Sequence, residues 1–106
     1  MQSTKQRRGS SLILTILSES NEVLSILQSV YTPEKTFIIT NLFTHEEHRN
    51  RGFGTRLLHR AIWEARRNKM LRIELDDCTD RGSTFYVHQG FHYVEPGFPE
   101  MIMCLV

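Results

Sequence analysis

The chain has 106 residues, which is enough for one domain and leaves no room for a second. Apolar residues make up 40% of the chain and charged residues 24%, a composition that excludes disordered and collagen-like classes. The formal net charge is +1, so bulk charge does not draw the chain to nucleic acid or to an anionic membrane.

We expect residues 1–10 to form a flexible tail and residues 11–106 to form a single folded domain. The apolar run Leu12–Leu17 is too short for a secretion signal, and no small-residue cleavage site follows it. No run approaches the roughly 18 apolar residues that span a bilayer. Cys78 and Cys104 lack C-x-x-C spacing and are expected to be reduced thiols. These features predict a cytoplasmic protein.

The first half of the domain has the pattern of β-structure. Apolar residues alternate with small or polar ones over Ser11–Ser18, and a β-rich run follows over Val23–Tyr31, with turn residues between them. These two runs predict a hairpin. Thr36–Thr44 is apolar enough for a central strand. Three strands therefore precede any helix.

The second half alternates helices with strands. From Thr55 to about Lys69, the apolar residues fall on one face of a helix. The later elements are a strand, a short helix stopped by a glycine, and two final strands: Leu71–Leu75, Asp80–Gln89 with Gly90, Phe91–Val94 and Met101–Leu105. The order βββ-α-β-α-ββ predicts an α/β (α+β) fold with a mixed sheet.

A glycine-containing turn, Arg49–Thr55, leads from the third strand into the long helix. Its two glycines allow a ligand to approach the backbone, and the amides of the first helical turn point outward at the positive end of the helix dipole. Pyrophosphate suits this geometry best. Arg49, Arg51 and Arg56 can add charge-assisted contacts. The alternative is a plain strand-to-helix turn with solvated arginines.

Two segments carry a resemblance to a known family. Arg49 to Gly54, within the stretch Leu42–Leu58, resembles in register the R/Q-x-x-G-x-G/A signature of the GNAT acetyltransferase superfamily. Phe85–Phe91 is similar to the family's aromatic-Tyr-x-x-x-Gly-Phe segment. The resemblance implies a mostly antiparallel sheet. It also implies an N-acetyltransferase that moves an acetyl group from acetyl-coenzyme A to a primary amine by direct attack.

The resemblance also implies which residues hold the cofactor. Backbone amides of Phe43 and Thr44 would hold the thioester carbonyl and the pantetheine arm, and those from Arg51 to Thr55 would hold the pyrophosphate. No metal is expected. The full predicted cofactor-binding set is Leu42, Phe43, Thr44, Arg49, Asn50, Arg51, Gly52, Phe53, Gly54, Thr55 and Arg56.

Tyr86 stands where the family has the tyrosine that protonates the departing thiolate, and a phenol is protonated at neutral pH, as an acid must be. Its alternative role is a packed aromatic side chain. A general base is also needed, because an ammonium group cannot attack. Asp76 and Asp77, at the end of a strand, are the first candidates. Further candidates are His45, Glu46 and Glu100.

The N-terminal region departs from the family pattern. Family members usually have a strand and two helices before the strand over Ser11–Ser18, and those helices wall the acceptor pocket. Only ten residues precede that strand here. The acceptor site is therefore expected to be open, completed by a second subunit in a homodimer, or built for a polypeptide amine rather than a small molecule. Thr79 and Gly82 stand where many members carry Asn and Ala.

Other functions are also compatible with parts of the sequence. The main alternative is a catalytically reduced GNAT-like module that binds coenzyme A or dimerises. No nucleic-acid or membrane partner is expected, because the net charge is near zero and Glu46 and Glu47 lie beside the arginine-rich turn. The histidines lack the tight, repeated spacing of zinc motifs. Trp63 lies beside the apolar stripe of the helix and is expected to be buried; the alternative is that it covers the edge of the stripe or meets a partner.

Overall fold

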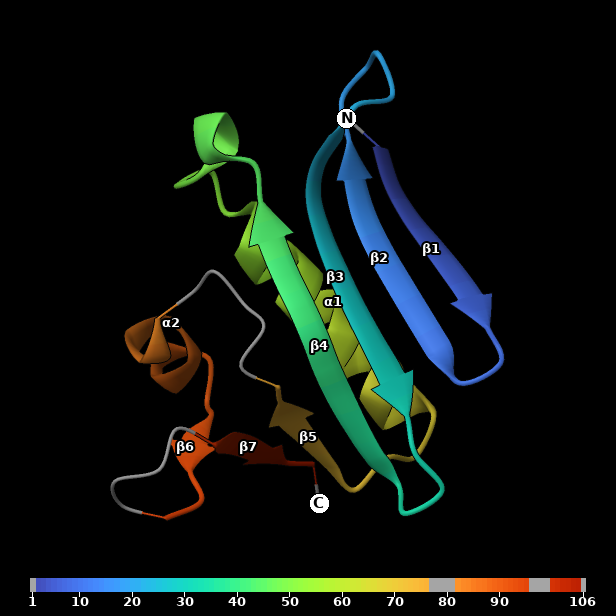
Figure 1. Cartoon of the computed structure of the whole chain (residues 1–106), viewed down its shortest axis with the longest axis vertical. Coiled ribbons are helices and arrows are strands. Elements are labelled where there is room, and N and C mark those ends of the chain that lie inside the picture. The colour runs from blue at the N-terminus through green and yellow to red at the C-terminus, as the bar shows by residue number, and fades with distance from the viewer. Residues whose placement is uncertain (1, 77–81, 96–99, 106) are drawn as a thin grey trace.

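Seven strands form one sheet in the order β1-β2-β3-β4-β5-β7-β6 (Figure 1). The structure is a computed structural model that describes residues 2–76, 82–95 and 100–105. Neighbouring strands are antiparallel, except for the parallel pair β4 and β5, which confirms the predicted mixed, mostly antiparallel sheet. The elements are β1 (Gln2–Arg8), β2 (Ser11–Leu17), β3 (Val23–Tyr31), β4 (Thr36–Thr44), η1 (Glu46–His48), α1 (Phe53–Arg67), β5 (Arg72–Leu75), α2 (Ser83–His88), β6 (His92–Tyr93) and β7 (Met101–Cys104).

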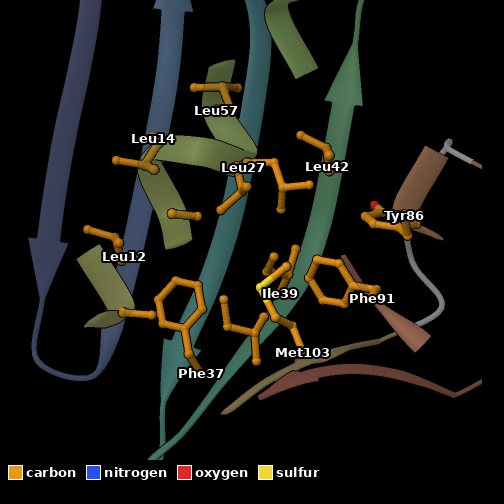
Figure 2. Packing of buried hydrophobic residues seen from close by; sticks show 14 of the residues in the cluster. Leu12, Leu14, Leu27, Phe37, Ile39, Leu42, Leu57, Tyr86, Phe91 and Met103 are labelled. Carbon is orange, nitrogen blue, oxygen red and sulfur yellow. The ribbon is translucent and has the colours of Figure 1, made fainter. Parts of the chain in front are cut away.

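The core lies between α1 and one face of the sheet (Figures 1 and 2). Alternate residues of β2 point toward α1, and Leu12, Leu14 and Ile16 are each buried there. On α1, Leu57 and Leu58 belong to the buried stripe that meets them. Each fully buried side chain of this size stabilises the fold by roughly 1.5 to 3 kcal/mol. No helix of the described residues covers the opposite face of β1 to β4.

The first strand corrects the prediction of a flexible tail over residues 1–10. Gln2–Arg8 pairs with β2 along its whole length, through a two-residue turn at Gly9 and Ser10. Gly9 has a φ of 57°, the left-handed conformation that such tight turns need. The strand is polar on both faces, so it lacks the apolar alternation from which strands are predicted. Its charged side chains also discourage further pairing at the sheet edge.

An ion pair ties β1 to α1, and a cation–π contact ties β1 to β3. Glu64 of α1 is only 2% exposed, and Lys5 Nζ lies 3.2 Å from its Oε1. The Arg7 guanidinium lies 4.1 Å from the centroid of the Tyr31 ring. Burial raises the pKa of the Tyr31 hydroxyl, an effect that the Arg7 charge opposes. Folding thus favours the neutral phenol, and this stabilisation is lost only as the pH rises above about 10.

Substitution of Lys5 by methionine is expected to destabilise the fold by about 1 to 3 kcal/mol, because it removes a partner of a buried carboxylate. Arg67, whose NH1 lies 3.8 Å from the same Oε1, limits the loss. In a Glu64→Gln background, Lys5→Met should cost less than about 1 kcal/mol. Urea unfolding of the four proteins measures both values, with Arg8→Met as a control on the other face of β1. Equal losses in the two backgrounds would show that the ion pair contributes nothing.

Candidate functional site

β4 and β5 stop pairing part-way along β4, and beyond that point the two strands leave a gap at one end of the sheet. They pair only between Thr36–Ile39 and Arg72–Leu75, and the last link is the Asp76 amide, which donates to the Ile39 carbonyl at 3.0 Å. β4 continues to Thr44 beyond this point. In the described part of the chain, no strand pairs with β4 on that side past Ile39. Among the described residues, the end of β4 therefore has no strand as a neighbour on this side.

A bulge in β4 changes the direction of these backbone groups. Gln28 of β3 is opposite Asn41, and the next residue, Ser29, is opposite Ile39, so Thr40 is an extra residue in β4. The Thr40 hydroxyl donates to the Gln28 carbonyl at 3.2 Å. Successive peptide groups of a strand face its two neighbouring strands in turn. An extra residue therefore reverses the facing direction of every peptide group that follows it.

Hydrogen bonds beyond the bulge show which peptide groups face β3. The His45 amide donates to a β3 carbonyl at 2.9 Å, and the Phe43 carbonyl accepts from the Ser25 hydroxyl of β3 at 3.1 Å. Since peptide groups alternate in direction along a strand, Leu42 and Thr44 direct theirs toward the gap. Of the predicted amide pair, Thr44 therefore faces the gap, whereas the bulge turns Phe43 toward β3. The role of either amide in holding a cofactor stays a prediction.

The glycine turn lies next to the end of β4, because Arg49 Nε donates to the Thr44 carbonyl at 3.2 Å. Gly52 is the N-cap of α1, with a φ of 80°, and its carbonyl accepts from the Arg56 amide at 3.0 Å. The amides of the intervening residues, Phe53 to Thr55, precede this first helical bond and point out of the helix end. The first turn of α1 contains no acidic residue.

The geometry of this turn fits an anionic group. A Cβ built on Gly52 would meet no atom within 4 Å, so the space beside the turn is open and glycine is required by its left-handed φ. Arg51 and Arg56 are exposed on either side of it. Outward amides, the helix dipole and arginine side chains together suit a pyrophosphate. The long helix begins at Phe53, two residues before the predicted Thr55.

Tyr86 lies on α2, and Figure 2 shows it beside Phe91 on the side of α2 that faces β4. It is 3% exposed, and its ring makes edge-to-face contacts with Phe85 and Phe91, at centroid distances of 5.1 and 5.5 Å. Gly90, with a φ of 103°, follows the helix end, as predicted. The packing role of Tyr86 is therefore present, while its role as an acid stays a prediction.

The candidate bases fall in different places. Asp76 is exposed directly where β4 and β5 separate, and Asp77 lies outside the described residues. Glu100 lines a hollow of about 460 Å³ together with Glu74 and Glu95, two carboxylates that sequence reasoning did not single out. The alternation in β5 that buries Ile73 does place Glu74 on the opposite face.

Residues 9–93 match the sequence pattern of the Acetyltransferase (GNAT) domain, which covers most of the chain. The chain belongs to the GNAT acetyltransferase family. No protein of curated function matches this GNAT chain. The two motifs on which the predicted resemblance rested both fall within the matched residues.

Solved GNAT structures share this fold. An acetyltransferase from Bacillus cereus superposes with a TM-score of 0.79 at 19% identity, over 90% of this chain and 73% of that one. A GNAT-family acetyltransferase from Staphylococcus aureus gives 0.75 at 16%, over 91% and 68%. The Paia N-acetyltransferase of Thermoplasma acidophilum, solved in complex with coenzyme A, gives 0.75 at 18%, over 90% and 61%. This GNAT chain thus spans roughly two thirds of the length of these proteins.

The structure describes two of the places at which this GNAT chain departs from the family pattern. One strand, β1, precedes β2, and the Gly9–Ser10 turn leads directly from one to the other without a helix between them. Gly82 is the N-cap of α2 in an extended conformation, so its low helix propensity does not weaken the helix. Cys78 and Thr79 lie outside the described residues.

Three possible metal ligands lie close together in η1 and at its N-cap, after the end of the GNAT chain's fourth strand. One ligand atom each of His45, Glu47 and His48 falls within 4.8 Å of the others. The sequence predicts no zinc site at His45 and His48, because their spacing differs from that of structural zinc motifs. His45 Nδ1 also accepts from the Glu47 amide at 3.4 Å, as a cap of the turn. The absence of a metal from the function stays a prediction. Within the described ranges, no helix is long and apolar enough to cross a membrane.

Proposed function

We propose that this protein is an N-acetyltransferase that moves an acetyl group from acetyl-coenzyme A to a primary amine by direct attack. The observation that carries the proposal is the adjacency of two anion-directed features. The gap beside Leu42 and Thr44 lies next to the N-terminus of α1, to which Arg49 connects it. Family membership and the solved complex of a structural relative with coenzyme A support the same ligand.

Acetyl-coenzyme A would supply an activated acyl group as its thioester. The amides from Arg51 to Thr55 and the side chains of Arg49 and Arg56 would hold its pyrophosphate. The Leu42 and Thr44 amides, directed into the gap, would stabilise negative charge that develops on the acyl oxygen. A single such donor is typically worth a hundredfold or more in rate. Preorganised backbone donors therefore supply much of the proposed catalysis.

Proton transfers would complete the reaction. Asp76, or Asp77 next to it, would take a proton from the acceptor ammonium so that the nitrogen can attack. The new C–N bond forms as the C–S bond breaks, and the Tyr86 hydroxyl would give its proton to the departing sulfur. The proton that the nitrogen loses as it becomes an amide would then restore the Tyr86 hydroxyl. The acceptor is proposed to be a small-molecule or polypeptide amine. A cytoplasmic location and a homodimer remain predictions.

A second candidate function is a module that binds coenzyme A or dimerises without transfer. The two-residue turn between β1 and β2 favours it, because it leaves out the helices that usually wall the acceptor site. The two candidates differ in one measurement, the release of free thiol on addition of amines. Cofactor binding without thiol release from a panel of mono- and polyamines and peptides would favour the module.

Thermal unfolding with and without acetyl-coenzyme A tests the shared part of both candidates. At a ligand concentration about a hundred times the Kd, linkage adds roughly 2.7 kcal/mol to the free energy of unfolding. Since each kcal/mol shifts the Tm of a domain this size by about 4 to 8 °C, a rise of roughly 10 to 20 °C is expected. An unchanged Tm at saturating cofactor would exclude cofactor binding and, with it, the proposed function.

Two glycines provide a matched pair for locating the site. Gly9 and Gly52 both have positive φ, and a Cβ on either would meet no atom within 4 Å. Each alanine substitution should therefore cost about 1 to 2 kcal/mol from backbone strain alone. Only Gly52→Ala should also reduce the Tm rise caused by acetyl-coenzyme A. Equal rises in the two variants would contradict a pyrophosphate site at the α1 turn.

A further inference from the structure

The near-zero net charge hides a separation of charge along the chain. Residues 49–72 hold eight Lys and Arg and only one acidic residue, Glu64, whereas the rest of the chain holds five basic and eleven acidic residues. Glu64 is 2% exposed and lies within 4 Å of both Lys5 and Arg67. The solvent side of α1 therefore presents basic side chains without an exposed carboxylate.

Trp63 lies in the middle of this basic surface, and the prediction that it is buried is wrong. It is 52% exposed. The guanidinium groups of Arg60 and Arg67 lie 5.4 and 5.2 Å from the centroid of its ring. Spacings of three and four residues place all three side chains on one side of the helix. The only tryptophan of the chain is thus held on the solvent face between two cations.

The surface continues from α1 onto β1. A hollow of about 170 Å³ beside Arg67 is lined by Lys5 and Arg7 of β1, by Tyr31 and Asn68, and by the carboxylate of Glu64, among others. Arg7 NH1 donates to Asn68 Oδ1 at 3.1 Å, which joins the strand to the end of the helix. We call Lys5, Arg7, Arg60, Trp63 and Arg67 the α1 basic face.

We propose that the α1 basic face binds single-stranded nucleic acid, with Trp63 stacked on an unpaired base and the four cations on neighbouring phosphates. Arginine forks match phosphate oxygens, and stacking on an aromatic ring beside a basic track is the usual sequence-tolerant mode for single strands. The prediction of no nucleic-acid partner rested on net charge and on Glu46 and Glu47. Those two carboxylates lie in η1, before the start of α1, and not on the face.

Other polyanions fit the surface less well. An acidic polypeptide would use the cations, but its carboxylates gain nothing from the negative face of an indole ring. An anionic membrane would need further apolar side chains around Trp63. Among the residues that the structure describes, the other exposed large hydrophobic ones lie outside α1: Val23, Phe43, Leu71, Val87, Tyr93 and Val94. The proposal is independent of acetyl transfer, since no residue of the α1 basic face belongs to the proposed cofactor site.

The full chain would be titrated with an oligothymidylate of about 12 nucleotides while its tryptophan fluorescence is recorded. Because the chain has one tryptophan, any change reports on Trp63 itself. Saturable quenching is expected, and the affinity should fall with salt with a logarithmic slope of roughly −3 for four phosphate contacts. No binding at low salt, or binding without a change in fluorescence, would refute the proposal.

A matched pair of arginines separates the face from bulk charge. Arg60→Gln should weaken binding about fivefold or more and lower the salt slope by roughly 0.7. Arg8→Gln makes the same change in net charge, but Arg8 lies on the other face of β1, beside Gln6 and Ile13, so binding should be unchanged. An equal loss in both variants would refute the proposal. Polyglutamate that competes as well as the oligonucleotide for the face would also refute it. The same holds if anionic vesicles shift the tryptophan emission to the blue while the oligonucleotide leaves it unchanged.

Discussion

Replacement of Tyr86 by phenylalanine is expected to lower the kcat of acetyl transfer by about a hundredfold or more, with acetyl-coenzyme A binding nearly unchanged. Loss of a positioned general acid typically removes a factor of roughly 10² to 10⁴. The phenyl ring keeps the edge-to-face contacts with Phe85 and Phe91, so the fold should retain its stability. Steady-state kinetics and the cofactor-induced Tm rise measure the two effects separately.

Tyr93→Phe is the matched control, because Tyr93 is 45% exposed on β6 and removal of its hydroxyl should leave kcat unchanged. Full activity of Tyr86→Phe would remove the acid role and leave only the packing role. Equal losses in kcat and in cofactor affinity would instead indicate that Tyr86 shapes the cofactor site. Only a fall confined to kcat agrees with proton transfer to the departing sulfur.

Replacement of Phe37 by alanine is expected to destabilise the fold by about 3 to 5 kcal/mol, a large part of the roughly 5 to 16 kcal/mol expected for a chain of this length. Phe37 is fully buried in β4, pairs with Ile73 of β5, and meets Tyr31 edge to face at 5.0 Å. It therefore stabilises the part of the sheet from which the gap opens. Urea unfolding measures the loss, with the slope m expected to stay constant.

Phe43 gives the matched comparison for Phe37, since it is the same residue type on the same strand but is 43% exposed. Phe43→Ala should change the free energy of unfolding by less than about 1 kcal/mol. Similar losses at the two positions would mean that the face opposite α1 is also packed in solution. A homodimer that covers this face would produce that result, and the dependence of Tm on protein concentration would detect it.

The sequence predicted those parts of the fold in which side-chain periodicity and burial agree. Val23–Tyr31 and Thr36–Thr44 are strands with the predicted bounds, and α1 has the predicted apolar stripe. The glycine turn before α1 was also recognised. In these segments each residue shows, by its own polarity, which face it occupies.

The tertiary structure decided the features that depend on partners far away in the sequence. β1 has no apolar face, and it is ordered by backbone pairing with β2 and by Lys5 against Glu64. The bulge at Thr40 turns the Leu42 amide, instead of that of Phe43, toward the gap. Trp63 has a large aromatic side chain of the kind often buried in cores, yet it is exposed to solvent.

One physical reason separates the features that the sequence predicted from those that the tertiary structure decided. Periodicity reports the contact of a segment with a single large apolar surface, and the chain itself contains that signal. Other features depend on which distant segment packs beside a given one. These are the register of strand pairing, ion pairs with a buried carboxylate, and the clustering of charge on one face. The sequence by itself therefore determined the strands β2 to β4, the long helix and the glycine turn, while folding decided the pairing of β1, where the amides point and where the charges gather.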